Sequence, residues 1–175
     1  GRHGGEWRPA ALTCTLVCRH PAPREREIVR HWASKKVTKT ATSPEFLHRL
    51  RVYIEDTDAG GIVYYVNYLK FMERARTEFM RVHGYGKTHI FNQDLMFVVQ
   101  SVAVNYCLAA QLDDELEASA RIVSLRGARI VFHQSVRRSG EVLAEGEITI
   151  ACVDRGQRKP RRLPAEMLAR LREVD

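Results

Sequence analysis

The feature that most constrains the fold is one long amphipathic segment near the middle of the chain. Its apolar residues recur at spacings of three and four, which predicts a helix of about five turns. Gly84 and Gly86 follow it as stop signals. The residues that set the period are Tyr65, Tyr68, Leu69, Met72, Ala75, Phe79 and Val82. The opposite face, which we expect to be solvated, carries Lys70, Glu73, Arg74, Arg76, Glu78 and Arg81.

Most of the remaining body has the pattern of strands. Leu50, Val52 and Ile54 alternate with polar residues before the helix, and strand-like runs follow it at 97–108, 116–122, 129–138 and 142–153. Ser139-Gly140-Glu141 predicts a hairpin turn between the last two runs, and 163–174 predicts a short helix. Because one helix cannot cover both faces of such a sheet, we predict an α+β fold. An antiparallel sheet of about five strands wraps around one long central helix, and its other face is left for a partner subunit.

The net charge of +7 is concentrated in the first quarter of the chain. Residues 1–45 contribute +5 of it and lack a sustained period of either kind. We therefore predict a basic extension over 1–45, disordered or weakly helical, before a folded domain over 46–175. The domain is nearly neutral and has no nucleic-acid-binding motif, which argues against nucleic acid as a partner. No apolar run reaches the roughly 18 residues of a transmembrane segment.

The four cysteines do not form a ligand pattern. Cys14 and Cys18 with His20 come nearest to a zinc site, but no second pair of ligands follows them. Cys107 and Cys152 lie far apart in strand-like runs. We predict reduced thiols in a cytoplasmic protein that holds no metal and no cofactor.

The loop between the first strand and the helix is the candidate for chemistry. Gly60 and Gly61 let a ligand approach the backbone, and the following helix offers free N–H groups to a developing oxyanion. A nearby carboxylate supports hydrolysis of an activated acyl group, as a general base or as a nucleophile that forms an anhydride. A thioester suits this site because its thiol leaves with a pKa of about 8.5. On spacing alone, an equal alternative is that Asp56 and Asp58 only stabilise a turn and cap the helix.

A resemblance to a known family narrows these alternatives. The run from Arg51 to Tyr64, RVYIEDTDAGGIVY, resembles the signature of hotdog-fold acyl-CoA thioesterases. The similarity is to the 4-hydroxybenzoyl-CoA thioesterase family, and most closely to its Tol–Pal-associated branch. It extends from Phe46 to Leu171 through Asn67-Tyr68, the string from Glu73 to Glu78, Leu112-Asp113-Asp114, Ser124-Leu125-Arg126-Gly127, Cys152-Val153-Asp154, Lys159-Pro160-Arg161 and Leu163-Pro164.

The resemblance implies a hotdog fold and hydrolysis of acyl-CoA, with acyl carrier protein thioesters as a further substrate class. It implies that Asp58 is the catalytic carboxylate and that the backbone N–H of Tyr65 is the oxyanion donor. Many members of the Tol–Pal branch have His at this position, whereas Tyr64-Tyr65 is closer to the hydroxybenzoyl branch. It also implies a homo-oligomer, either a dimer or a dimer of dimers such as a homotetramer, with the site at a subunit interface.

Substrate binding is assigned to Gly60, Gly61, Arg126, Lys159 and Arg161. Basic residues crowd 155–162, where they suit the phosphates of coenzyme A or form a solvated loop. The alternative function is a non-hydrolytic acyl-CoA or acyl-carrier-protein binding protein on the same fold.

Further candidates have weaker support. His133, His83 and His89 lack a sequence partner and are interpreted as structural or exposed, and Glu73 as a solvated helix residue. Residues 97–99 are candidates for the acyl pocket, although the sequence does not show which side of the sheet they face.

Overall fold

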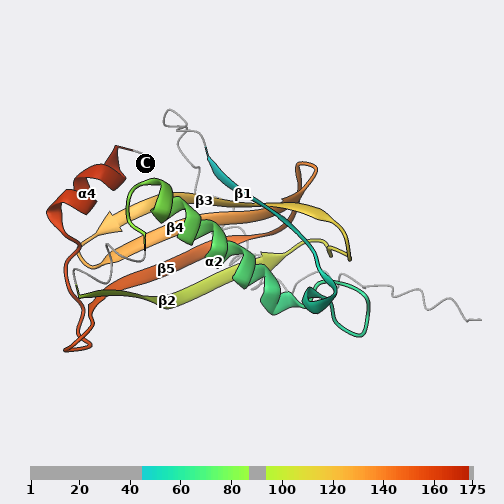
Figure 1. Ribbon diagram of the computed structural model, residues 1–175, viewed down its shortest axis with the longest axis horizontal. Helices are drawn as coiled ribbons and strands as arrows, with labels where there is room; N and C mark the ends of the chain where they lie inside the picture. Colours follow the sequence, from blue (N-terminus) through green and yellow to red (C-terminus); the bar gives the residue numbers. More distant parts are fainter. Residues whose placement is uncertain (1–44, 87–93, 174–175) are drawn as a thin grey trace, which may run out of the picture. The chain divides into compact units, whose positions relative to one another are not determined.

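The computed structural model describes residues 45–86 and 94–173. Within these ranges five strands form one sheet in the order β1-β3-β4-β5-β2, and all neighbouring strands are antiparallel. The strands are β1 (Phe46–Arg51), β2 (Leu95–Tyr106), β3 (Glu115–Arg126), β4 (Arg129–Arg138) and β5 (Glu141–Asp154). The long helix α2 (Tyr65–Val82) crosses one face of this sheet (Figure 1). The predicted α+β fold with one central helix is therefore confirmed.

The connection between β4 and β5 is the predicted hairpin. Arg138 pairs with Glu141, and Ser139 and Gly140 between them have positive φ values of 51° and 85°. A two-residue turn with positive φ at both positions matches the right-handed twist of the flanking strands. At the other end of the order, β2 pairs with β5, and its second edge has no strand beside it among the described residues.

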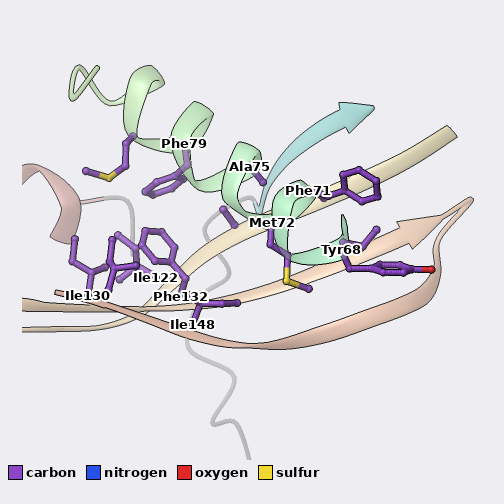
Figure 2. Packing of buried hydrophobic residues seen from close by; sticks show 14 of the residues in the cluster. Tyr68, Phe71, Met72, Ala75, Phe79, Ile122, Ile130, Phe132 and Ile148 are labelled. Carbon is purple, nitrogen blue, oxygen red and sulfur yellow. The ribbon is translucent and has the colours of Figure 1, made fainter. Parts of the chain in front are cut away.

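The core lies between α2 and the sheet (Figure 2). Phe79 makes an edge contact with Phe132 of β4, with ring centroids 5.7 Å apart. Burial of this apolar face accounts for much of the helix's stability, because an isolated helix is marginal in water. Five residues of α2 belong to the same buried cluster as Ile122, Ile130 and Ile148 of the strands: Tyr68, Phe71, Met72, Ala75 and Phe79.

The predicted apolar face of α2 needs three corrections. Tyr65 and Val82 are 56% and 67% exposed, and both lie in terminal turns of the helix. Phe71, which did not fit the predicted period, is buried. Arg76, expected on the solvated face, is buried, and its Nη1 donates a hydrogen bond to Oε1 of Gln134 on β4 at 2.6 Å.

The first strand ends earlier than predicted. After β1, residues Ile54–Asp56 form the short 3₁₀ helix η1, and Ile54 is 73% exposed rather than buried. Nitrogen of Tyr53 donates to Oδ2 of Asp56 at 3.0 Å, which fixes this turn. A side-chain hydrogen bond of this kind competes with continuation of the strand.

The C-terminal helix α4 (Ala165–Arg172) buries Met167 and Leu171. The chain reaches it through a backbone hydrogen bond of 3.1 Å from Leu163 to Gly127, in the turn between β3 and β4. Among the helices in the described ranges, none combines the length and the apolar character needed to cross a membrane.

Candidate active site

The Asp58 loop is a tight reversal of the chain between η1 and α2. Thr57 and Val63 form an antiparallel bridge, and the nitrogen of Asp58 donates to the carbonyl of Ile62 at 2.9 Å. Gly61 completes the turn by donating to the carbonyl of Asp58 at 3.0 Å, with a positive φ of 76° that suits glycine. The loop is therefore held by its own backbone and presents Asp58 at its tip.

The Asp58 carboxylate is exposed and oriented by one hydrogen bond. Its Oδ1 accepts from the nitrogen of Gly60 at 2.7 Å. This bond confirms the part of the alternative reading in which Asp58 stabilises a turn. Because it uses a single carboxylate oxygen, it is compatible with a chemical role for the other.

Asp56 has a different environment. It is 6% exposed, and its carbonyl accepts hydrogen bonds from Nδ2 of Asn67 at 2.7 Å and from the nitrogen of Tyr64 at 2.9 Å. These bonds join η1 to the first turn of α2. Asp56 is therefore a structural residue that fixes the loop against the helix.

The N-terminus of α2 has no side-chain cap. Tyr64 occupies the N-cap position and makes no capping hydrogen bond, so neither Asp56 nor Asp58 caps this helix. That part of the alternative reading is wrong. The first-turn N–H groups, Tyr65 included, point along the helix axis with the positive end of the dipole, which suits an oxyanion.

Tyrosine side chains surround the start of α2. The ring centroids of Tyr64 and Tyr65 lie 4.8 Å apart, and Tyr106 of β2 lies 6.1 Å from Tyr65 and 5.7 Å from Tyr68. A hydrogen bond with Tyr65 and the charges of Tyr65 and Asp58, together with burial, raise the pKa of Tyr64. Burial likewise raises the pKa of Tyr106. Tyr106 could not be assigned to this site from local patterns, because only the fold brings the end of β2 to the start of α2.

The basic candidates lie at the opposite end of the sheet. The Asp58 loop contacts residues before β3, since Val63 donates to Ala110 at 2.9 Å, whereas Arg126 ends β3. A strand of this length spans about 36 Å. Lys159 and Arg161 lie in the loop after β5, which joins the end of β3 through Gly127, and Arg161 forms an ion pair of 3.6 Å with Asp154. One chain therefore brings Asp58, Gly60, Gly61 and Tyr65 together, and separately gathers Arg126, Lys159 and Arg161.

The weaker candidates are scattered. Nδ1 of His133 on β4 is buried without a hydrogen-bond partner among the described residues. Burial and the charge of Arg170 lower the pKa of His83 at the end of α2. Phe97 and Val99 line a cavity beside α2 together with Glu73, whereas Val98 does not.

His89 lies outside the described residues, as do Cys14, Cys18 and His20, which were not expected to form a zinc site. Within the described ranges, no group of three or more His, Cys, Asp or Glu residues is placed to hold a metal ion.

Known proteins match the part of the chain that contains the described domain. Residues 52–171 match the thioesterase-like superfamily. The acyl-CoA thioesterase YbgC of Haemophilus influenzae is 44% identical over 125 residues, which cover 71% of this chain and 92% of that protein. The acyl-CoA thioester hydrolase YbgC of Escherichia coli is 42% identical over 125 residues, or 71% of this chain and 93% of that protein.

A comparison with solved structures supports the same family. The crystal structure of a probable thioesterase from Bartonella henselae has a TM-score of 0.66 and 36% identity, and covers 69% of this chain and 99% of that chain. The described strand order and central helix are those of the hotdog fold, as the resemblance implied. The chain belongs to the thioesterase-like superfamily.

Proposed function

We propose that this protein is an acyl-CoA thioesterase that hydrolyses acyl thioesters to the free acid and coenzyme A. The observation that carries the proposal is the exposed Asp58 carboxylate, oriented by Gly60 and followed by the uncapped N-terminus of α2. The YbgC relatives, which are named acyl-CoA thioesterases or thioester hydrolases, support the same activity.

In the proposed reaction, the thioester carbonyl oxygen accepts a hydrogen bond from the N–H of Tyr65. Asp58 then either removes a proton from the attacking water or attacks the carbonyl carbon itself. In the first route, the water oxygen bonds to the carbonyl carbon, the C–S bond breaks, and the proton passes to the thiolate. In the second, a carboxylate oxygen of Asp58 bonds to the carbonyl carbon, the C–S bond breaks and the thiolate leaves. Water then hydrolyses the resulting anhydride, which regenerates the carboxylate, releases the acid and supplies the proton that the thiolate takes up. The thiolate is a good leaving group, since its conjugate thiol has a pKa of about 8.5.

The test is thiol release from a panel of acyl-CoAs by the wild-type protein and Asp58→Asn. The amide keeps an acceptor for Gly60 but loses basicity and nucleophilicity, so kcat should fall about a hundredfold or more with KM little changed. Asp113→Asn is a matched control, because Asp113 is exposed and has a positive φ of 67° that Asn tolerates. Equal rates for wild type and Asp58→Asn would refute the proposed role of Asp58.

The second candidate function is a non-hydrolytic acyl-CoA or acyl-carrier-protein binding protein. It is supported by Tyr65, which stands where His is frequent in the Tol–Pal branch. Saturable binding of acyl-CoA without thiol release at any chain length would favour this function over hydrolysis.

Assembly through β2 completes the proposal. This edge strand is twelve residues long and exposes Val98, Val99, Val102 and Tyr106, and such an edge readily pairs with a second strand. We propose a dimer that pairs two copies of β2, and a dimer of dimers built from it. A sedimentation experiment showing only monomer at micromolar concentration would contradict it.

The finer assignments are also proposals. Membership of the Tol–Pal-associated branch is supported by the motifs of the sequence. A cytoplasmic location is supported by the free thiols of Cys107 and Cys152.

A further inference from the structure

A cavity of about 540 Å³ lies between the second half of α2 and strand β2. Neither Asp58 nor Tyr65 lines it. Arg76, which does, is eleven residues after Tyr65 on α2. That separation corresponds to about 16 Å along the helix axis. The cavity is therefore distinct from the Asp58 loop of the same chain, and its volume is in the range of small-molecule sites.

The cavity walls are mostly apolar. Met80 contributes from α2, Leu95, Phe97 and Val99 from β2, and Ile150 from β5. Such walls favour a ligand with a hydrocarbon or aromatic body, because its burial removes apolar surface from water.

Arg76 is a buried charged residue in the lining of this cavity. The residue is 9% exposed, and its Nη1 donates to Oε1 of Gln134 at 2.6 Å. Gln134 is itself fixed, because its Nε2 donates to the carbonyls of Met72 at 2.9 Å and Ser119 at 2.8 Å. The guanidinium is thus held in one orientation beside the cavity by an amide that has no freedom to turn.

The charge of Arg76 has no carboxylate partner within 4.0 Å in the described part of the chain. Burial lowers its pKa and the charge of nearby Glu73 raises it, but a guanidinium remains protonated in either case. Glu73 is exposed at the cavity, where water screens its charge. Two further arginines line the cavity: Arg81, which is paired with Glu78, and Arg155, which also has an interaction of its own. A buried cation without a counter-ion is unfavourable, so an anion that enters the cavity gains a partner there.

We propose that this cavity is a binding site for an amphipathic carboxylate. The carboxylate pairs with the guanidinium of Arg76, whose planar fork matches its geometry, and the apolar body lies against Phe97, Val99 and Ile150. The ligand class is a straight-chain or arylalkyl carboxylic acid, the same class as the acid that thioester hydrolysis releases. Binding does not depend on the chemistry of Asp58.

Calorimetric titration of the full chain with decanoate and decanol tests the charge requirement directly. The two probes have the same chain length and differ in the head group. Because a hydrogen bond to a charged group is about twice as strong as a neutral one, decanoate should bind about tenfold or more tightly than decanol. Equal affinities of the wild-type protein for the two probes would overturn the proposal.

Substitution of Arg76 tests the residue. Arg76→Met keeps the length of the side chain and should reduce the preference for decanoate over decanol to about one. Arg74→Met is the matched control, since Arg74 is exposed on the same helix and does not line the cavity. An unchanged preference in Arg76→Met would overturn the assignment.

Two further variants keep the test decisive. If Arg76→Met does not fold, Thr77→Trp on α2 fills the cavity from an exposed position away from the β2 edge and should weaken both probes. Unchanged binding of both probes would contradict the proposed location. Asp58→Asn should bind decanoate as the wild type does. A clear change in that variant would assign the acid to the Asp58 loop instead, whether or not the thioesterase proposal holds.

Discussion

Gly60 and Gly61 are neighbours in the Asp58 loop but are required for different reasons. A Cβ atom at Gly60 would lie 3.0 Å from Oδ1 of Asp58, whereas one at Gly61 would meet no heavy atom within 4 Å. Gly61 instead has a positive φ of 76°, which side chains rarely adopt. The first glycine therefore leaves room for the carboxylate, and the second permits the turn.

Gly60→Ala should reduce activity more than stability. The added methyl group displaces the Asp58 carboxylate, and a displacement of this kind lowers kcat about tenfold to a hundredfold. The loop tip is exposed, so the free energy of unfolding should change little. Thiol release and a denaturant titration on the same samples measure both effects.

Gly61→Ala is the matched comparison. Its methyl group meets nothing but strains the backbone, so it should lower the free energy of unfolding by about 1 kcal/mol. Activity should remain closer to that of the wild type than in Gly60→Ala. The reverse order of the two activities would show that loop conformation, rather than room beside Asp58, limits the reaction.

At the scale of the elements, the sequence predicted most of the fold because its periods are strong. The run 129–138 coincides with β4 and the hairpin turn was correctly placed, since alternation and a Ser-Gly turn are local signals. The prediction that Ile54 belongs to the first strand was wrong because a hydrogen bond to the Asp56 side chain ends the strand. The prediction that Arg76 is solvated was wrong because its hydrogen-bond acceptor, Gln134, lies 58 residues away in the sequence. Local patterns cannot show a partner that only the tertiary fold supplies.

Gly146 on β5 lies closely against the backbone of β2. A Cβ atom there would lie 2.1 Å from the carbonyl oxygen of Ala103 and 2.8 Å from Cα of Val104, so backbone must move to accept it. Gly146→Ala should therefore lower the free energy of unfolding by about 2 kcal/mol or more and loosen the end of β2. Relative to the wild type, amide hydrogen exchange in Gly146→Ala should become faster in β2 than in β3.

Gly86→Ala provides the control for this prediction. A Cβ atom at Gly86 would make an ordinary contact of 3.9 Å with Cγ of Arg81. Its free energy of unfolding should change by about 0.5 kcal/mol or less. Similar losses in the two variants would contradict a special steric requirement at Gly146.

At the scale of the whole described domain, the candidate site divides into two groups. Asp58, Gly60, Gly61 and Tyr65 lie within eight consecutive residues, so the sequence could predict their proximity. The positions of Arg126, Lys159 and Arg161 relative to them depend on the direction of each strand. The fold places these basic residues at the far end of the sheet from Asp58 of the same chain.

The proposed dimer resolves this separation through the direction of β2. Tyr106 at the end of β2 lies beside Tyr65, whereas Asp94 before the start of β2 accepts a hydrogen bond of 2.8 Å from Arg155 in the basic loop. A two-fold axis pairs two copies of β2 antiparallel, so the start of one strand faces the end of the other. The basic loop of one subunit would then approach the Asp58 loop of its partner.

Subunit mixing tests this arrangement. Asp58→Asn removes the carboxylate, and a variant with Ala at Arg126, Lys159 and Arg161 should raise KM for acyl-CoA about tenfold by losing phosphate contacts. A heterodimer of the two, purified through different tags, would contain one site with wild-type Asp58 and wild-type basic residues from opposite chains. It should recover the wild-type KM at half the wild-type number of sites. If the basic residues served Asp58 of their own chain, no site in the heterodimer would be intact, and KM would remain that of the basic-loop variant.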